Sequence, residues 1–174
     1  MTRSSLLLLA ASFTGVCSLH AQTAGSTLGP VLADAKASYN SIKGYLTRAA
    51  AAMPAENYSF QPTPDIRTFG ALMAHIADHQ VRFCSQARGA AKKGDPTLTT
   101  KAELVDALAA SFKECDAAWD SITDANAGEM VGQRSRLGTL LVDVIHSNEE
   151  YGYMAIYFRM KGIVPPSSDR SGGR

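Results

Sequence analysis

Hydrophobic residues recur at steps of three and four along four long stretches of this chain, a pattern typical of amphipathic helices. The stretches run from after Ser26 to before Pro54, from near Thr68 to about Gly89, from Thr100 to about Ile122, and from Ser135 to about Lys161. Thr100 and Glu103 have the spacing of a capping box, which supports a helix start there. We find no alternating strand pattern and no internal repeat. The sequence therefore predicts an all-α fold, a four-helix bundle.

The length of 174 residues, of which 45% are hydrophobic, suits one core and one domain. We expect a signal peptide over residues 1–21, the bundle over 26–166 and a disordered tail over 167–174. The leader has Arg3 and then an apolar run, Leu6 to Val16, which is too short to span a membrane. No later segment is long enough to do so. The mature protein is therefore predicted to be exported, as a periplasmic or secreted protein.

The charge balance argues against one class of partner. The formal net charge is +1 and no long basic run is present, whereas a nucleic-acid-binding protein would show clustered Lys and Arg. We therefore expect no nucleic acid partner, and a small molecule is the partner to consider.

Two cysteines of the mature chain bear on the topology. If the second and third helices run parallel, the ten residues between them can cross back along the bundle, and Cys84 and Cys115 then lie at nearly equal depth. A disulfide between them suits an exported protein. Two separate buried thiols are the alternative, because cysteine packs well as a small hydrophobe.

Two pairs of polar residues interrupt the apolar faces of the second and fourth helices. His75 and His79 are four residues apart, as are His146 and Glu150, so each pair shares a helix face. If the two helices are antiparallel, the pairs lie level across the bundle, which is how metal sites in bundles are built. The ligand types suit zinc, and iron and nickel are alternatives. Ordinary polar residues in hydrogen-bonded positions would explain the same pattern.

Two segments resemble a known family. They are FGALMAHIADHQVRFCSQA (Phe69 to Ala87) and HSNEEYGYMAIYFRMKGIVPPSS (His146 to Ser168), and they are similar to the DinB-like family of four-helix-bundle metalloenzymes. The resemblance extends from about Leu28 to Ser168. It implies an up-down-down-up bundle with a crossover between helices 2 and 3. It also implies a divalent metal, zinc or nickel, held by three histidines.

The family's ligand positions fall on His75, His146 and Glu150, and the last is a departure because the family usually has histidine there. His79 is a candidate for an extra ligand, one turn from His75. Tyr153 and Tyr157 lie on the same helix face as Glu150, and packing is the favoured role for them over orienting a ligand.

These expectations give two functional hypotheses. The first is an exported, metal-binding protein that acts as a metal-dependent (thiol) transferase or hydrolase on a small molecule. The second is a non-catalytic bundle with a degenerate metal site, serving as a binding or interaction module. Because the fourth helix is apolar on most sides, we also expect a homodimer.

Overall fold

A computed structural model describes residues 28–95 and 97–170. The described residues form four long helices, a 3-10 turn and two very short strands, which confirms the predicted all-α bundle. The elements are α1 (Gly29–Ala52), η1 (Ala55–Asn57), α2 (Phe69–Ala87), α3 (Lys101–Asp120), β1 (Met130–Val131), β2 (Arg134–Ser135) and α4 (Arg136–Met160). The predicted signal peptide, residues 1–21, lies outside the described residues, as do the last four residues of the predicted tail.

Three of the helices begin at side-chain caps that the sequence indicates. The Thr68 hydroxyl accepts a hydrogen bond from Ala71 N, and the Ser135 hydroxyl accepts one from Gly138 N. Thr100 forms a complete capping box with Glu103. The first helix differs, because its N-cap is Leu28, which forms no side-chain cap; Ser26, after which the sequence predicts this helix, lies outside the described residues. Caps supply partners for the free N–H groups of a first helical turn, so they mark helix starts locally.

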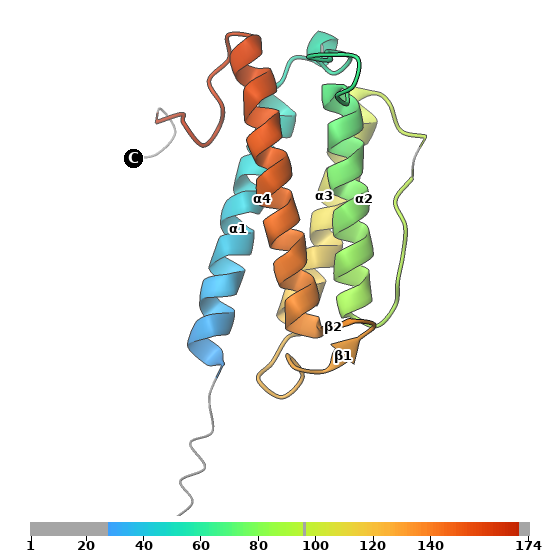
Figure 1. The fold of residues 1–174 in the computed structure, drawn as a ribbon, viewed down its shortest axis with the longest axis vertical. Helices are drawn as coiled ribbons and strands as arrows, with labels where there is room; N and C mark the ends of the chain where they lie inside the picture. The colour runs from blue at the N-terminus through green and yellow to red at the C-terminus, as the bar shows by residue number, and fades with distance from the viewer. Residues whose placement is uncertain (1–27, 96, 171–174) are drawn as a thin grey trace, which may run out of the picture.

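The chain runs up through α1 and down through α2, then returns along the outside of the bundle and runs down through α3 and up through α4 (Figure 1). Ion pairs hold the returning segment, since Arg88 and Lys92 both contact Glu114 of α3, at 2.8 and 2.6 Å. Farther along, Gly94 N donates to the Asp78 carboxylate at 2.7 Å. A side chain at Gly94 would meet Asp78 at 3.1 Å, so glycine permits this close approach.

Cys84 and Cys115 form a disulfide that joins α2 to α3, with their Cα atoms 4.8 Å apart. Both residues are fully buried. Of the two alternatives that the sequence leaves open, the structure therefore has the bridge. Parallel helices make it possible, because both cysteines lie toward the C-terminal ends of their helices and face each other.

A small hairpin precedes α4, in a stretch where the sequence shows no alternating strand pattern. Met130 pairs with Ser135 and Val131 with Arg134, antiparallel. Gly132 has φ of +81°, a conformation that glycine adopts readily. Two-residue strands are too short to show an alternation of hydrophobic and polar positions, so a pattern search does not detect them.

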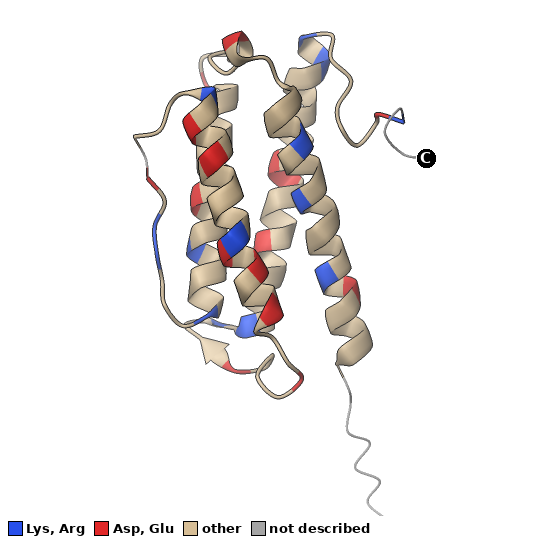
Figure 2. Cartoon of the chain, turned by 180° about the vertical axis from the view of Figure 1, so that it is seen from behind, with Lys and Arg blue, Asp and Glu red and all other residues tan. Residues whose placement is uncertain are grey.

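The core lies between the helices and is continuous from end to end of the bundle. Charged residues of both signs lie along the helices seen from behind (Figure 2). Helix α4 is not buried on all sides, because Ile145 and Ile156 are 67% and 52% exposed. Among the described residues, no helix is long and apolar enough to cross a membrane. The first residue of the predicted tail, Ser167, donates its N–H to the Tyr151 hydroxyl at 2.7 Å.

Candidate metal centre

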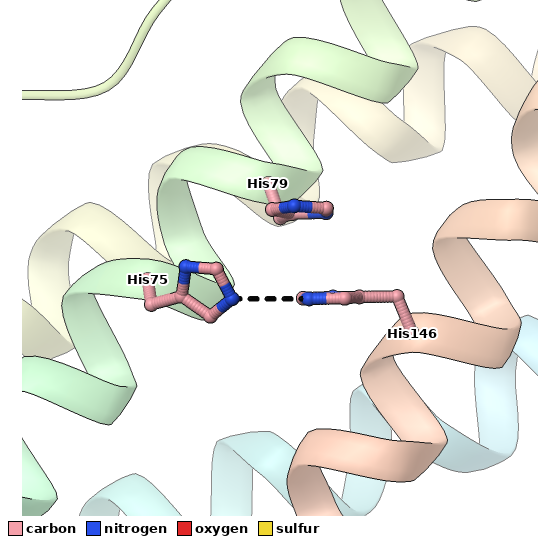
Figure 3. A group of neighbouring side chains, drawn as sticks. All are labelled: His75, His79 and His146. Atoms are coloured by element: carbon pink, nitrogen blue, oxygen red, sulfur yellow. Dashed lines mark hydrogen bonds between the residues drawn. The ribbon is translucent and has the colours of Figure 1, made fainter. Parts of the chain in front are cut away.

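The four predicted site residues come together between α2 and α4. His75 Nε2 lies 3.1 Å from His146 Nε2, a contact that joins the two helices (Figure 3). Glu150 Oε1 lies 3.5 Å from His75 Nε2 and 3.4 Å from His146 Nε2. The two pairs of site residues lie at the same height on antiparallel helices, as predicted. One nitrogen from each histidine therefore lies next to the same carboxylate oxygen.

These three atoms form a nearly equilateral triangle with the dimensions of a metal-binding face. For bonds of about 2.1 Å, neighbouring ligand atoms lie about 3.4 Å apart around a tetrahedral ion, and about 3.0 Å apart around an octahedral one. The observed sides, 3.1, 3.4 and 3.5 Å, fall in that range. His75, His146 and Glu150 would thus be the residues that hold one divalent ion.

Burial and charge at the site also suit a cation. The side chain of Glu150 is 9% exposed, and its second oxygen, Oε2, has no hydrogen-bond partner among the described residues. A buried carboxylate oxygen without a hydrogen-bond partner costs free energy, and a cation bound to the carboxylate offsets that cost. Burial, followed by the charge of His75, lowers the pKa of His146 to about 4. His146 is therefore neutral near pH 7, the protonation state in which an imidazole nitrogen binds a metal.

His79 belongs to the cluster but is oriented differently from the other two histidines. A ring nitrogen of His79 lies within 4.8 Å of those of His75 and His146. However, its ring stacks on that of His146, with centroids 3.6 Å apart and planes at 10° (Figure 3). Its Nε2 is 2.8 Å from the Arg82 guanidinium, and burial, then the charge of His146, lowers the pKa of His79 to about 4.

The orientation of His79 decides what it can do. Nitrogen lone pairs lie in the ring plane, and the rings of His79 and His146 are stacked and nearly parallel, so their lone pairs lie in two separate parallel planes. As oriented, His79 covers His146 and does not complete a set of four ligands.

A second group of metal-ligand types lies deeper in the bundle, and the sequence analysis did not single it out. Asp143 Oδ2 is 3.8 Å from the sulfur of Cys84 and 3.9 Å from that of Cys115. Both sulfurs are bonded to each other, so they are not thiolates available to an ion. Asp143 is 1% exposed and its Oδ1 has no hydrogen-bond partner among the described residues. Its position seven residues before Glu150, on the same helix face, is a sequence signal that could have identified it.

Two clefts reach the metal centre from different sides. One, of about 730 Å³, lies beneath the segment that connects α2 to α3 and reaches His75. The other, of about 560 Å³, is bounded by the loop before α2, by Leu72, and by Glu150, Tyr153, Ile156 and Tyr157 of α4. We call the second one the Glu150 cleft. A small molecule in it would lie against the carboxylate of the triangle.

Comparisons with known proteins give a family for the sequence and a solved structure with a similar fold. The family model described as the DinB superfamily matches residues 43–154, more than half of the chain, and this range includes all four site residues. A crystal structure of a DinB-like protein from Bacillus cereus ATCC 10987 superposes with a TM-score of 0.64. That match covers 76% of this chain and 93% of the other, at 17% sequence identity, and therefore speaks for the fold alone. A search of curated proteins found no significant match.

Proposed function

Because this chain belongs to the DinB superfamily, we propose that it binds one divalent metal ion through His75, His146 and Glu150 and acts as a metal-dependent transferase or hydrolase on a small molecule. The observation that carries the proposal is the triangle of ligand atoms, whose sides of 3.1–3.5 Å match the spacing of ligands around one ion. Zinc and nickel are the metals we propose, and iron also suits two imidazoles and one carboxylate.

Each residue has a separate task in this proposal. His75 and His146 present imidazole nitrogens from opposite helices, and Glu150 supplies the negative charge that favours a cation over a neutral guest. When bound, a divalent ion in such a site acidifies a bound water or holds a thiolate. His79 stacks on His146 and shields one face of its ring from solvent.

The Glu150 cleft supports an enzyme over a non-catalytic bundle with a degenerate site. A degenerate site would be free to close by packing side chains over the old ligand positions. Here a cleft of about 560 Å³ instead reaches Glu150, large enough for a small molecule. The departure from three histidines is the observation that favours the interaction module, and metal analysis separates the two hypotheses.

Metal content of the mature, untagged protein is the test. We expect about one ion per chain in the wild type and little in His146→Ala or Glu150→Gln, because each variant removes one of the three proposed ligand atoms. Glu149→Gln is a matched control, since Glu149 is the neighbouring carboxylate, exposed, and accepts a hydrogen bond from Tyr153 instead. Absence of metal from the wild type after separate incubation with zinc, nickel and iron(II) would reject the metalloenzyme proposal.

We also propose that the protein is exported, with removal of residues 1–21. The leader pattern and the Cys84–Cys115 disulfide support this, because disulfides persist mainly outside reducing compartments. Mass spectrometry of the protein from the periplasmic or medium fraction should show a chain that begins at Gln22. Uncleaved protein confined to the cytoplasm would contradict it.

A homodimer remains part of the proposal. Its support is two exposed apolar residues of α4 outside the Glu150 cleft, Ile145 and Met160, each more than half exposed. Sedimentation velocity should show a dimer that Ile145→Glu weakens, and a monomer at all concentrations would refute this.

A further inference from the structure

The walls of the Glu150 cleft are apolar and accessible. Ile66, Tyr153 and Ile156 are 46%, 50% and 52% exposed, and all three line this one cleft. Together with Leu72 they come from a loop and from two helices, so the apolar surface is assembled by the fold. Exposed apolar side chains gathered around one concave site mark it as a place for the apolar body of a ligand.

One cation stands at the same cleft. Arg67 lines it and is exposed, and its guanidinium makes no hydrogen bond or ion pair with any described residue. Its backbone, by contrast, is held in place, because the Tyr157 hydroxyl donates to the Arg67 carbonyl at 2.6 Å. A loop anchored next to the cleft thus presents a positive charge that no described residue pairs with.

A second charge lies on the same loop. Asp65 also lines the cleft and is exposed. Its negative charge opposes that of Arg67, so the affinity of the cleft for an anion depends on both residues.

From this arrangement we propose that the Glu150 cleft binds small carboxylates with an apolar body. The carboxylate pairs with Arg67, the apolar body lies against Ile66, Tyr153 and Ile156, and the far end of the molecule reaches Glu150. As a statement about the substrate, the inference rests on the proposed function. Binding itself does not require the metal, which allows the two to be tested apart.

The probes are 3-phenylpropanoate and its neutral counterpart 3-phenylpropanamide, which have the same shape and differ in charge. Each is titrated into the mature full-length chain, both zinc-loaded and metal-free, and binding is followed by NMR chemical shifts. We expect the carboxylate to shift the resonances of cleft residues and to bind more tightly than the amide. Arg67→Gln should weaken carboxylate binding about fivefold or more, the scale of losing one exposed ion pair, and leave amide binding unchanged.

Two variants serve as controls for charge. Arg48→Gln removes an arginine of α1 outside the cleft and should leave both affinities unchanged. Asp65→Asn removes the anion at the cleft and should strengthen carboxylate binding. The inference is overturned if the amide binds as tightly as the carboxylate, if Arg67→Gln behaves like Arg48→Gln, or if neither probe shifts the cleft resonances.

Failure of this inference is distinguishable from failure of the proposed function. Glu150→Gln should lose metal and still bind the carboxylate, at least as tightly as the metal-free wild type, because a negative charge next to the cleft has been removed. Metal binding without selectivity for the carboxylate would overturn only the substrate class. Carboxylate binding that depends on Arg67, in a chain that binds no metal, would support the cleft and reject the metalloenzyme.

Discussion

Asp143 makes the stability of this protein depend on pH in an unusual direction. The carboxyl group is 1% exposed beside the buried disulfide, and burial raises its pKa from 3.8 to about 7. A shift of this size corresponds to roughly 4 kcal/mol, at 1.36 kcal/mol for each pKa unit. That is a large share of the 5–15 kcal/mol by which domains are typically stable.

The sign follows from which state holds the proton more tightly. The folded chain keeps Asp143 protonated up to about pH 7, whereas the unfolded chain ionises it above about pH 4. The contribution to the free energy of unfolding is therefore fully present below about pH 4. It falls as the pH rises from about 4 to about 7 and stays low above that. Most paired carboxylates behave in the opposite way.

Asp143→Asn tests this, because asparagine has nearly the same shape and cannot ionise. Urea denaturation of both proteins, at pH 4 and pH 8, with a chelator and no reductant, gives four free energies of unfolding. We expect the difference between wild type and variant to change by roughly 4 kcal/mol between the two pH values, in favour of the variant at pH 8.

Comparing the difference between the two proteins at two pH values removes the contributions of the other titrating groups, which both proteins share. It also removes any pH-independent free-energy cost of the new amide. A difference that is the same at pH 4 and pH 8 would refute the reasoning, whatever the absolute stabilities.

Two further predictions concern local stability. Replacing Cys84 and Cys115 together by alanine opens a bridge across 31 residues and should cost about 3–4 kcal/mol of unfolding free energy in denaturant titrations. Equal stability of this variant and the wild type under oxidising conditions would contradict that role. Thr100→Ala removes the cap of α3 and should cost about 1 kcal/mol by thermal unfolding, while Thr99→Ala serves as the control. Similar losses in both variants would argue against a specific capping effect.

Helix starts could be predicted because capping is a local matter. Thr68, Thr100 and Ser135 each bond to a backbone N–H three residues ahead, so the residues that decide the helix start are contiguous. The hairpin before α4 could not be predicted from periodicity, because its strands have two residues each. Gly132 was the one signal that it left in the sequence.

The candidate site was predictable in part. The spacing of four residues places His75 and His79 on one helix face, and His146 and Glu150 on one face of another helix. Antiparallel packing of these two helices then brings the pairs to the same height in the bundle. The orientation of the His79 ring depends on contacts with His146 and Arg82, which come from packing and from a neighbouring turn. Arg67 was not identified because its sequence neighbours say nothing about a cleft that α4 completes.

The sequence by itself determined the helices, their caps and the faces that carry His75, His146 and Glu150, because helical periodicity links residues only a few positions apart. Tertiary structure decided that Cys84 and Cys115 are bonded and that Asp143 lies buried beside them. It also decided that Arg67 lines the Glu150 cleft, where its side chain pairs with no other residue in the described part of the chain. Each of these depends on distances between segments far apart in the chain, which follow from how whole helices pack and not from any local pattern.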